Sequence, residues 1–218
     1  MSAPTSLPRL AVIADRFTEP DRAERILAAV DAGARWIHLR DHDTSLDTFA
    51  ESARTLAARL RSGSDAVLLT VNTRVDLADE LGDGVHLGWR GASVEEAREV
   101  LGHDALIGYS AHDDLDADGD RARGVDYHFF SPVYPTPSKP DHPGTGVGAL
   151  RSFCKVADPI PVYALGGITP ERVAECLQAG AYGVAVLSGI MEADVPAART
   201  RAYLRALSNV DFSRTAPT

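Results

Sequence analysis

The sequence predicts a single (β/α)₈ barrel, the TIM-barrel fold, because strand-like and helix-like segments alternate eight times along 218 residues. The connections between these segments are short, as is usual in closed parallel barrels. The main structural alternative, an open doubly wound sheet, usually carries a Gly-rich fingerprint early in the chain, and none is present. Length and composition fit one domain over residues 1–218, with a core over about 9–207 and frayed ends at 1–8 and 210–218.

Eight short runs of apolar and β-branched residues are the predicted strands: Leu10–Ala14, Trp36–Arg40, Val67–Asn72, Gly84–Leu87, Leu106–Tyr109, Tyr127–Ser131, Pro161–Leu165 and Gly183–Leu187. Apolar side chains at helical spacing predict the helices between them. These are Pro20–Ala32, Leu46–Leu60, Arg74–Leu81, Ser93–Leu101, Asp113–Arg123, Gly148–Val156, Pro170–Ala179 and Pro196–Leu207. Gly33, Gly82, Gly124 and Gly180 follow predicted helices, as C-terminal capping residues do.

Composition excludes several classes of function. The formal net charge is −9 and no block of basic residues occurs, which argues against a nucleic-acid partner. No apolar run of membrane-spanning length and no signal peptide is visible, so we expect a cytoplasmic protein without a membrane partner. Cys154 and Cys176 lie on predicted helices and should be buried or half-buried thiols in a reducing compartment. Only two of the 22 basic residues are lysines, Lys139 and Lys155.

A phosphate site is predicted where the seventh and eighth strands end. The seventh strand stops at Gly166-Gly167, and a helix should open with Thr169 as N-cap and Pro170 at its first position. The eighth strand ends at Ser188-Gly189. In a barrel these two loops form the usual phosphate site, and glycines let a phosphate approach bare backbone. The alternative is a Gly-Gly turn that only saves space.

Polar residues gather at the ends of the other strands, where barrel enzymes carry their chemistry. His38 and Arg40 share one face of the second strand, so both can point into the barrel mouth. An inward arginine is costly unless it meets an anion, although a salt bridge to a neighbouring carboxylate would also satisfy it. His38 could equally be a hydrogen-bonded residue that fills the barrel. Further pocket candidates at strand ends are His42, Asn72, Trp89, Ser110 and His112, the last of which could be a first-turn helix residue.

His38, Asp41, His42, Asp43 and His86 also raise the question of a metal site. Their spacing matches no compact zinc pattern and gives no helical i,i+4 pair, so no metal is predicted. Asp41 and Asp43 could as easily begin the next helix, with Thr44 or Ser45 as its cap.

The connection from Pro132 to Gly146 is long for a loop between a strand and a helix. It is rich in proline and carries Thr136, Ser138 and Lys139, which could close over an anion. Stiff loops of this kind near an active-site mouth often act as lids, the alternative being a structural surface loop.

These motifs, in this order, resemble the family of thiamine phosphate synthases and TenI-type proteins of thiamine biosynthesis, over about Leu10 to Leu207. The resemblance is carried by six segments, which are residues 37–40 (IHLR), 72–78 (NTRVDLA), 84–88 (GVHLG), 107–112 (IGYSAH), 131–139 (SPVYPTPSK) and 164–168 (ALGGI). A synthase of this family joins a pyrimidine pyrophosphate to a thiazole phosphate with Mg²⁺. The resemblance implies that Arg40, Asn72, Ser110 and Lys139 surround the pyrophosphate. It places the thiazole phosphate at Thr136, Ser138, Gly166, Gly167, Ser188 and Gly189.

Several positions depart from the family pattern. The Gln-x-Arg-x-Lys of the second strand reads His38-Leu39-Arg40-Asp41-His42, so the pyrophosphate lysine is His42. The two expected magnesium carboxylates are replaced at Thr73 and in the segment Trp89-Arg90-Gly91, and Trp89 adds bulk where the pyrimidine should lie. Mg²⁺ needs hard oxygen ligands, so these changes argue against it. A TenI-type tautomerase uses a histidine base at the sixth strand, and that position is Pro132.

The preferred interpretation is a diverged member of this family that binds a thiazole phosphate or a similar small phosphate ester. It would catalyse proton transfer without Mg²⁺ or any other cofactor, as a thiazole tautomerase-like isomerase. His38 is the first candidate base and His112 the second, with Arg40 pairing the ligand. The alternatives are a thiamine phosphate synthase, which would need Mg²⁺, and a non-catalytic or recruited phosphate-binding barrel. Assembly as a homo-oligomer stays open.

Overall fold

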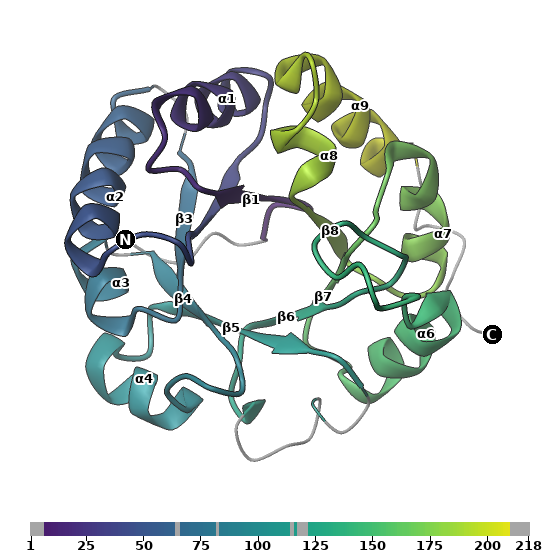
Figure 1. Cartoon of the computed structure of the whole chain (residues 1–218). Helices are drawn as coiled ribbons and strands as arrows, with labels where there is room; N and C mark the ends of the chain where they lie inside the picture. Colours follow the sequence, from purple (N-terminus) through teal and green to yellow (C-terminus); the bar gives the residue numbers. More distant parts are fainter. Residues whose placement is uncertain (1–6, 64–65, 82, 114–115, 117–121, 210–218) are drawn as a thin grey trace.

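The computed structural model describes residues 7–63, 66–81, 83–113, 116 and 122–209. Eight parallel strands form a closed barrel in sequence order, which confirms the predicted fold class (Figure 1). The strands are β1 (Leu10–Asp15), β2 (Trp36–Arg40), β3 (Leu68–Asn72), β4 (Gly84–Leu87), β5 (Leu106–Ala111), β6 (Tyr127–Phe130), β7 (Val162–Leu165) and β8 (Gly183–Val186).

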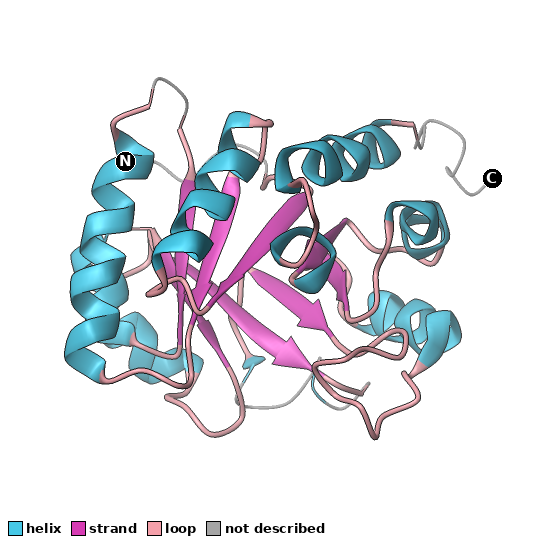
Figure 2. Ribbon diagram, turned by 45° about the horizontal axis from the view of Figure 1, so that its top comes forward, coloured by secondary structure: helices cyan, strands magenta, loops and turns pink. Residues whose placement is uncertain are grey.

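Helices surround the barrel on its outside (Figure 2). They are α1 (Pro20–Asp31), α2 (Leu46–Arg61), α3 (Val75–Leu81), α4 (Val94–Leu101), α6 (Gly146–Val156), η2 (Pro170–Arg172), α7 (Val173–Gln178), α8 (Ser188–Met191) and α9 (Pro196–Ser208). Alternate strand residues such as Ile37 and Leu39 are fully buried in the core that the helices cover. In the described part of the chain, no helix has both the length and the apolar character needed to cross a membrane.

Local sequence signals account for several helix ends. Ser45 is the N-cap of α2, and its hydroxyl accepts a hydrogen bond from the Thr48 N–H at 3.2 Å. Ser93 and Glu96 form a capping box at the start of α4. The predicted capping glycines Gly33, Gly124 and Gly180 have positive φ angles, whereas Gly82 lies outside the described residues.

Apart from shifts of one or two residues at element ends, the predicted elements differ from the structure in two places. The helix expected at Pro170 starts as the short 3₁₀ segment η2, and no side-chain cap hydrogen bond from Thr169 accompanies it. The short helix α8 lies where the sequence predicts a loop after the eighth strand, since four residues are too few to give a helical pattern. The helix expected over Asp113–Arg123 falls largely on residues 114–115 and 117–121, outside the described residues.

The chain start is also more ordered than expected. Residues 1–6 and 210–218 lie outside the described part, but Leu7 and Pro8, expected to fray, are held in place. The Tyr182 hydroxyl donates to the Leu7 carbonyl at 2.8 Å, and the Tyr163 hydroxyl donates to the Pro8 carbonyl at 2.9 Å. Tyrosines on or beside β7 and β8 therefore tie this segment to the barrel.

Aromatic side chains fill the barrel interior near the amino-terminal ends of the strands. The Trp36 ring packs edge-on against Tyr127, with centroids 4.7 Å apart, and against Tyr163 at 5.0 Å. Gly108 on β5 leaves the room for Tyr127, because a Cβ there would lie 2.0 Å from its ring. These side chains fill the interior at this end, and the cavity lies where the strands finish.

Candidate functional site

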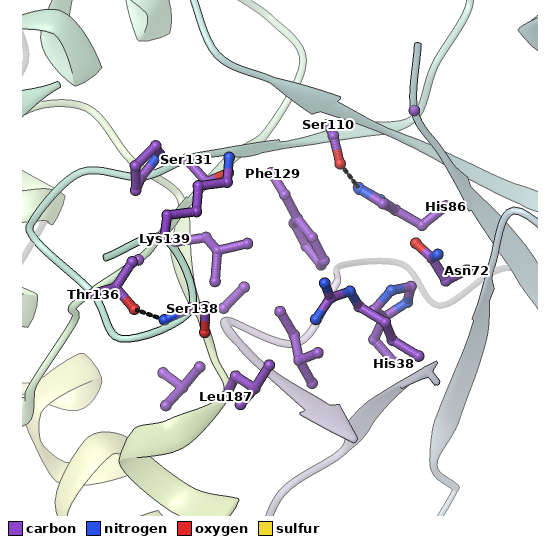
Figure 3. Close-up of a pocket in the computed structure, with 18 of the residues that line it drawn as sticks. His38, Asn72, His86, Ser110, Phe129, Ser131, Thr136, Ser138, Lys139 and Leu187 are labelled. Carbon is purple, nitrogen blue, oxygen red and sulfur yellow. Dashed lines mark hydrogen bonds between the residues drawn. The ribbon is translucent and has the colours of Figure 1, made fainter. Parts of the chain in front are cut away.

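One cavity of about 500 Å³ opens at the carboxyl ends of the strands. It is lined by every site residue predicted from the sequence. These are His38, Arg40, His42, Asn72, Trp89, Ser110, His112, Thr136, Ser138, Lys139, Gly166, Gly167, Ser188 and Gly189. Six of them are labelled in Figure 3, namely His38, Asn72, Ser110, Thr136, Ser138 and Lys139. Figure 3 shows Thr136, Ser138 and Lys139 on one side, facing His38 and Asn72 on the other. Among the described lining residues there is no carboxylate.

The floor of the cavity consists of His38, His86 and Phe129. The His86 ring stacks on Phe129 with centroids 4.3 Å apart, and His38 lies edge-on to both rings. His86 makes two hydrogen bonds, one between Nδ1 and the Tyr127 hydroxyl (3.1 Å) and one between Nε2 and the Ser110 hydroxyl (2.9 Å). In the neutral ring one of these nitrogens donates and the other accepts. Burial, followed by the charge of His38, holds the pKa of His86 well below its ordinary value. The floor therefore presents aromatic, uncharged surface at neutral pH.

His38 is a buried, hydrogen-bonded residue. Its Nδ1 lies 3.0 Å from the Thr70 hydroxyl, which also accepts from the Trp36 indole N–H at 2.9 Å. Burial and then the charge of Arg40 lower the pKa of His38 to about 3. An imidazole with so low a pKa is a weak proton acceptor near pH 7. The second possibility raised from the sequence, a histidine that fills the barrel, fits this geometry.

Arg40, His42 and Lys139 lie together at the rim of the cavity and are called the basic cluster, in which Arg40 and Lys139 carry the positive charge. Burial and then the charge of Arg40 lower the pKa of both His42 and Lys139, so the three groups lie within electrostatic reach of one another. The Arg40 guanidinium lies 3.8 Å from the Asp15 carboxylate, which is a long ion pair. No carboxylate of the described residues pairs with Lys139. The rim is thus suited to an anion.

Gly166, Gly167, Ser188 and Gly189, with Thr136 and Ser138, form the opposite side of the cavity, the glycine end. Gly166 and Gly167 follow β7, and Ser188 and Gly189 open α8 after β8. Within the described part of the chain, the backbone N–H groups of Gly167, Ser188 and Gly189 donate no hydrogen bond to a protein atom. Converging N–H groups from these two loops, with a short extra helix, are the usual barrel arrangement for a phosphate.

The glycines also have a packing role. Gly167 has φ +63°, and a Cβ there would lie 2.5 Å from the Pro135 carbonyl oxygen. A Cβ on Gly189 would lie 2.2 Å from the Tyr203 hydroxyl. The glycines therefore allow close packing, as the alternative of a space-saving turn proposes. The same residues also line the cavity.

The long loop after β6 is tied down at its stem. The Val133 and Tyr134 N–H groups donate to the carbonyls of Leu165 and Gly166, at 2.9 and 3.1 Å. The tip is closed by a hydrogen bond from the Lys139 N–H to the Thr136 carbonyl at 3.0 Å. The loop thus carries Thr136, Ser138 and Lys139 to the cavity on a short, braced turn.

His112 lies on the opposite side of the loop stem. Its Nδ1 is 2.6 Å from the Ser131 carbonyl oxygen, beside Pro132. Because a carbonyl can only accept, Nδ1 must carry a proton, and in the neutral ring Nε2 is then left as an acceptor. The side chain is exposed and lines the cavity. The hydrogen bond between His112 and Ser131 joins the ends of two neighbouring strands, and no local sequence pattern predicts it.

The residues around the cavity do not fit the Mg²⁺ that the sequence resemblance implies for a synthase. Neither Asp nor Glu is among the described lining residues, and no group of His, Cys, Asp or Glu side chains there could hold a metal ion. The Thr73 hydroxyl donates to the neighbouring Asn72 carbonyl at 2.8 Å, and Arg90 brings another positive charge. Hard divalent cations need several oxygen ligands, carboxylates above all.

Residues 10–190 match the family described as thiamine monophosphate synthase. A thiamine-phosphate synthase of Haloquadratum walsbyi is 39% identical over 190 residues, which cover 86% of this chain and 84% of that protein. The thiamine biosynthesis bifunctional protein ThiM/ThiE of Symbiobacterium thermophilum is 42% identical over 198 residues, or 89% of this chain, which spans only 40% of that longer protein. The solved structure of thiamine phosphate pyrophosphorylase from Pyrococcus furiosus superposes with a TM-score of 0.80 at 31% identity, covering 92% of this chain and 95% of that one.

Proposed function

This chain belongs to the thiamine monophosphate synthase family, and we propose that its cavity joins a pyrimidine pyrophosphate to a thiazole phosphate. The observation that supports the proposal is that one cavity is lined at one end by the basic cluster and at the other by the glycine end, two arrangements suited to anions. A coupling reaction between two phosphorylated substrates needs both ends, whereas a proton shift within one phosphate ester needs only the glycine end. The names of the relatives are those of synthases, so the tautomerase preference stated from the sequence has no specific support.

In the proposed reaction a bond forms between the thiazole nitrogen and the pyrimidine methylene carbon. The bond from that carbon to the pyrophosphate oxygen breaks, and the electron pair leaves with the pyrophosphate. The glycine end would hold the thiazole phosphate through backbone N–H groups, and the uncharged floor of Phe129, His38 and His86 would support the rings. Arg40 and Lys139 would face the oxygens on which negative charge develops.

The test is formation of the coupled product from both substrates, followed by mass spectrometry, with Ser188→Asp as the informative variant. A carboxylate at Ser188 should raise the KM for the thiazole phosphate about tenfold through like-charge repulsion. Ser152→Asp, on the exposed face of α6, is the matched control and should leave the KM unchanged. The wild-type protein failing to form product under any condition, while binding phosphate esters, would contradict the coupling reaction and favour a recruited binding barrel.

A proton-transfer reaction is the second candidate, and the fixed tautomer of His112 is the observation that favours it. The low pKa of His38 makes that residue a poor base, so the role would pass to Nε2 of His112. In that case His112→Asn should lower isomerisation about 10²-fold or more with little change in ligand affinity. Equal isomerisation by the variant would exclude His112 as the base.

A further inference from the structure

The basic cluster places the positive charges of Arg40 and Lys139 side by side at the cavity rim. Arg40 pairs with Asp15 at 3.8 Å. The carboxylates of Asp15, Asp43 and Asp41 act on the neighbouring His42, whereas no carboxylate acts on Lys139 among the described residues. The charge of Arg40 acts on both His42 and Lys139. Arg90, whose guanidinium lies over the exposed Trp89 ring at 4.6 Å, adds another cation to the same cavity lining. A polyanion placed among these groups would relieve their mutual repulsion.

These cations occupy the part of the cavity where a divalent metal would otherwise be needed to neutralise a pyrophosphate. A guanidinium binds two phosphate oxygens at once, and an ammonium acts as a compact point charge. Mg²⁺ would bring two further positive charges among Arg40, Lys139 and Arg90, without a carboxylate from the described lining to hold it. Protein cations and metal are therefore alternatives here.

We propose that the basic cluster of Arg40, His42 and Lys139 binds the pyrophosphate group of the substrate without a divalent metal. This inference rests on the proposed coupling function and adds to it how the leaving group is stabilised. When the carbon–oxygen bond breaks, the electron pair stays on the pyrophosphate, and the fixed charges of Arg40 and Lys139 stabilise it. The metal requirement of this chain would then differ from the one that the sequence resemblance implies.

The direct test is titration of the protein with inorganic pyrophosphate by calorimetry, once in EDTA and once in excess Mg²⁺. Tryptophan fluorescence gives a second readout, because Trp36 is fully buried whereas Trp89 is 61% exposed and lines the cavity. We expect binding in EDTA to be as tight as in Mg²⁺, or tighter. Binding that occurs only in Mg²⁺ would overturn the proposal.

Two variants locate the site. Arg40→Gln should weaken pyrophosphate binding in EDTA about tenfold or more, the usual effect of losing a charge-assisted hydrogen-bonded pair. Arg54→Gln is the control, since Arg54 pairs with Glu80 on the outer surface and should not affect binding. Equal affinity of Arg40→Gln and the wild type, with both shown to be folded by circular dichroism, would contradict the proposed site.

The double variant Thr73→Asp with Arg90→Asp tests whether carboxylates in place of these residues make pyrophosphate binding depend on Mg²⁺. Thr73 has φ +59°, a left-handed conformation that suits aspartate better than a β-branched residue, so the backbone should tolerate the change. We expect weaker binding of pyrophosphate in EDTA and partial recovery in Mg²⁺. Binding that is identical to wild type in both buffers would count against the proposal.

The two proposals fail separately. Metal-free pyrophosphate binding without product formation would remove the coupling function and leave the anion site. Product formation that needs Mg²⁺, with no pyrophosphate binding in EDTA, would remove the metal-free site and leave the coupling function.

Discussion

The two ends of the cavity are built from different parts of the chain. The glycine end is made of backbone, and its glycines fit against the loop after β6 and against α9 with no room for a side chain. The basic cluster is made of long side chains that extend from strand ends and from the loop tip. Substitution of Gly166, Gly167 or Gly189 should therefore disturb folding, whereas substitution in the basic cluster should change ligand binding alone.

The largest expected effect is the loss of stability in Gly189→Ala. The added methyl group would push away the Tyr203 hydroxyl, which donates a buried hydrogen bond to the Ile168 carbonyl at 2.8 Å. Overpacking together with the lost hydrogen bond should lower the free energy of unfolding by about 2–4 kcal/mol. Denaturant unfolding measures it. Gly88→Ala, where a Cβ meets nothing within 4 Å, is the control and should change stability by less than about 0.5 kcal/mol. Equal stability of Gly189→Ala and Gly88→Ala would contradict a packing role for the glycine end.

The packing at Gly167 affects how the phosphate site is tested. Gly167→Asp adds charge, but any side chain there meets the Pro135 carbonyl, so lost binding would not separate from lost folding. Ser188→Asp avoids this problem because it keeps the backbone contacts of both glycines.

The dependence of folding stability on pH tests the buried histidines, of which His38 belongs to the cavity floor. Burial lowers the pKa of His38 to about 3 and that of His128, outside the cavity, to about 4. Because the unfolded chain binds these protons first, stability should be complete above about pH 6.5 and fall as the pH drops toward 4. Each histidine should contribute a slope of up to about 1.4 kcal/mol per pH unit.

The histidine contribution can be isolated with His128→Phe, whose ring would pack beside Phe153 in the outer core. Its unfolding free energy should fall less than that of the wild type between pH 7 and pH 5, measured in urea. Parallel pH profiles for the two proteins would show that His128 does not titrate in this way.

A smaller effect is expected at the basic cluster, and the two lysines of the chain make a matched pair. Lys139→Met should lower kcat/KM for the pyrimidine pyrophosphate about tenfold, through the loss of one charge on the leaving group. Stability should not change. Lys155→Met, on the exposed surface of α6, should alter neither quantity. Steady-state kinetics measures kcat/KM, and unfolding curves measure stability. A loss of stability in Lys139→Met would contradict the expectation that the basic cluster affects ligand binding alone.

The smallest effect should come from His112→Asn in the coupling assay. The His112 side chain is hydrogen-bonded to the Ser131 carbonyl and to no residue of the basic cluster or the glycine end in the described structure, so we expect coupling to fall less than about threefold. A loss of about 10²-fold would instead indicate proton transfer in the rate-limiting step and favour the second candidate function.

The sequence by itself determined the barrel and which polar residues line its cavity. Strand periodicity and capping signals are local, so they mark the eight strand ends, and a closed parallel barrel must bring those ends together. His38, Asn72 and Lys139 could thus be assigned to one cavity although they are far apart along the chain. Arg40 could be predicted to point inward for the same reason.

Only the tertiary structure decided how those residues behave. The low pKa of His38 depends on burial beneath Arg40, and the tautomer of His112 depends on the Ser131 carbonyl of the neighbouring strand. The helix α8 is too short for a periodic pattern, so its packing against α9 and β1 defines it. Burial, charge proximity and packing are properties of pairs of residues that meet only after folding, and a pattern read along one chain does not contain them.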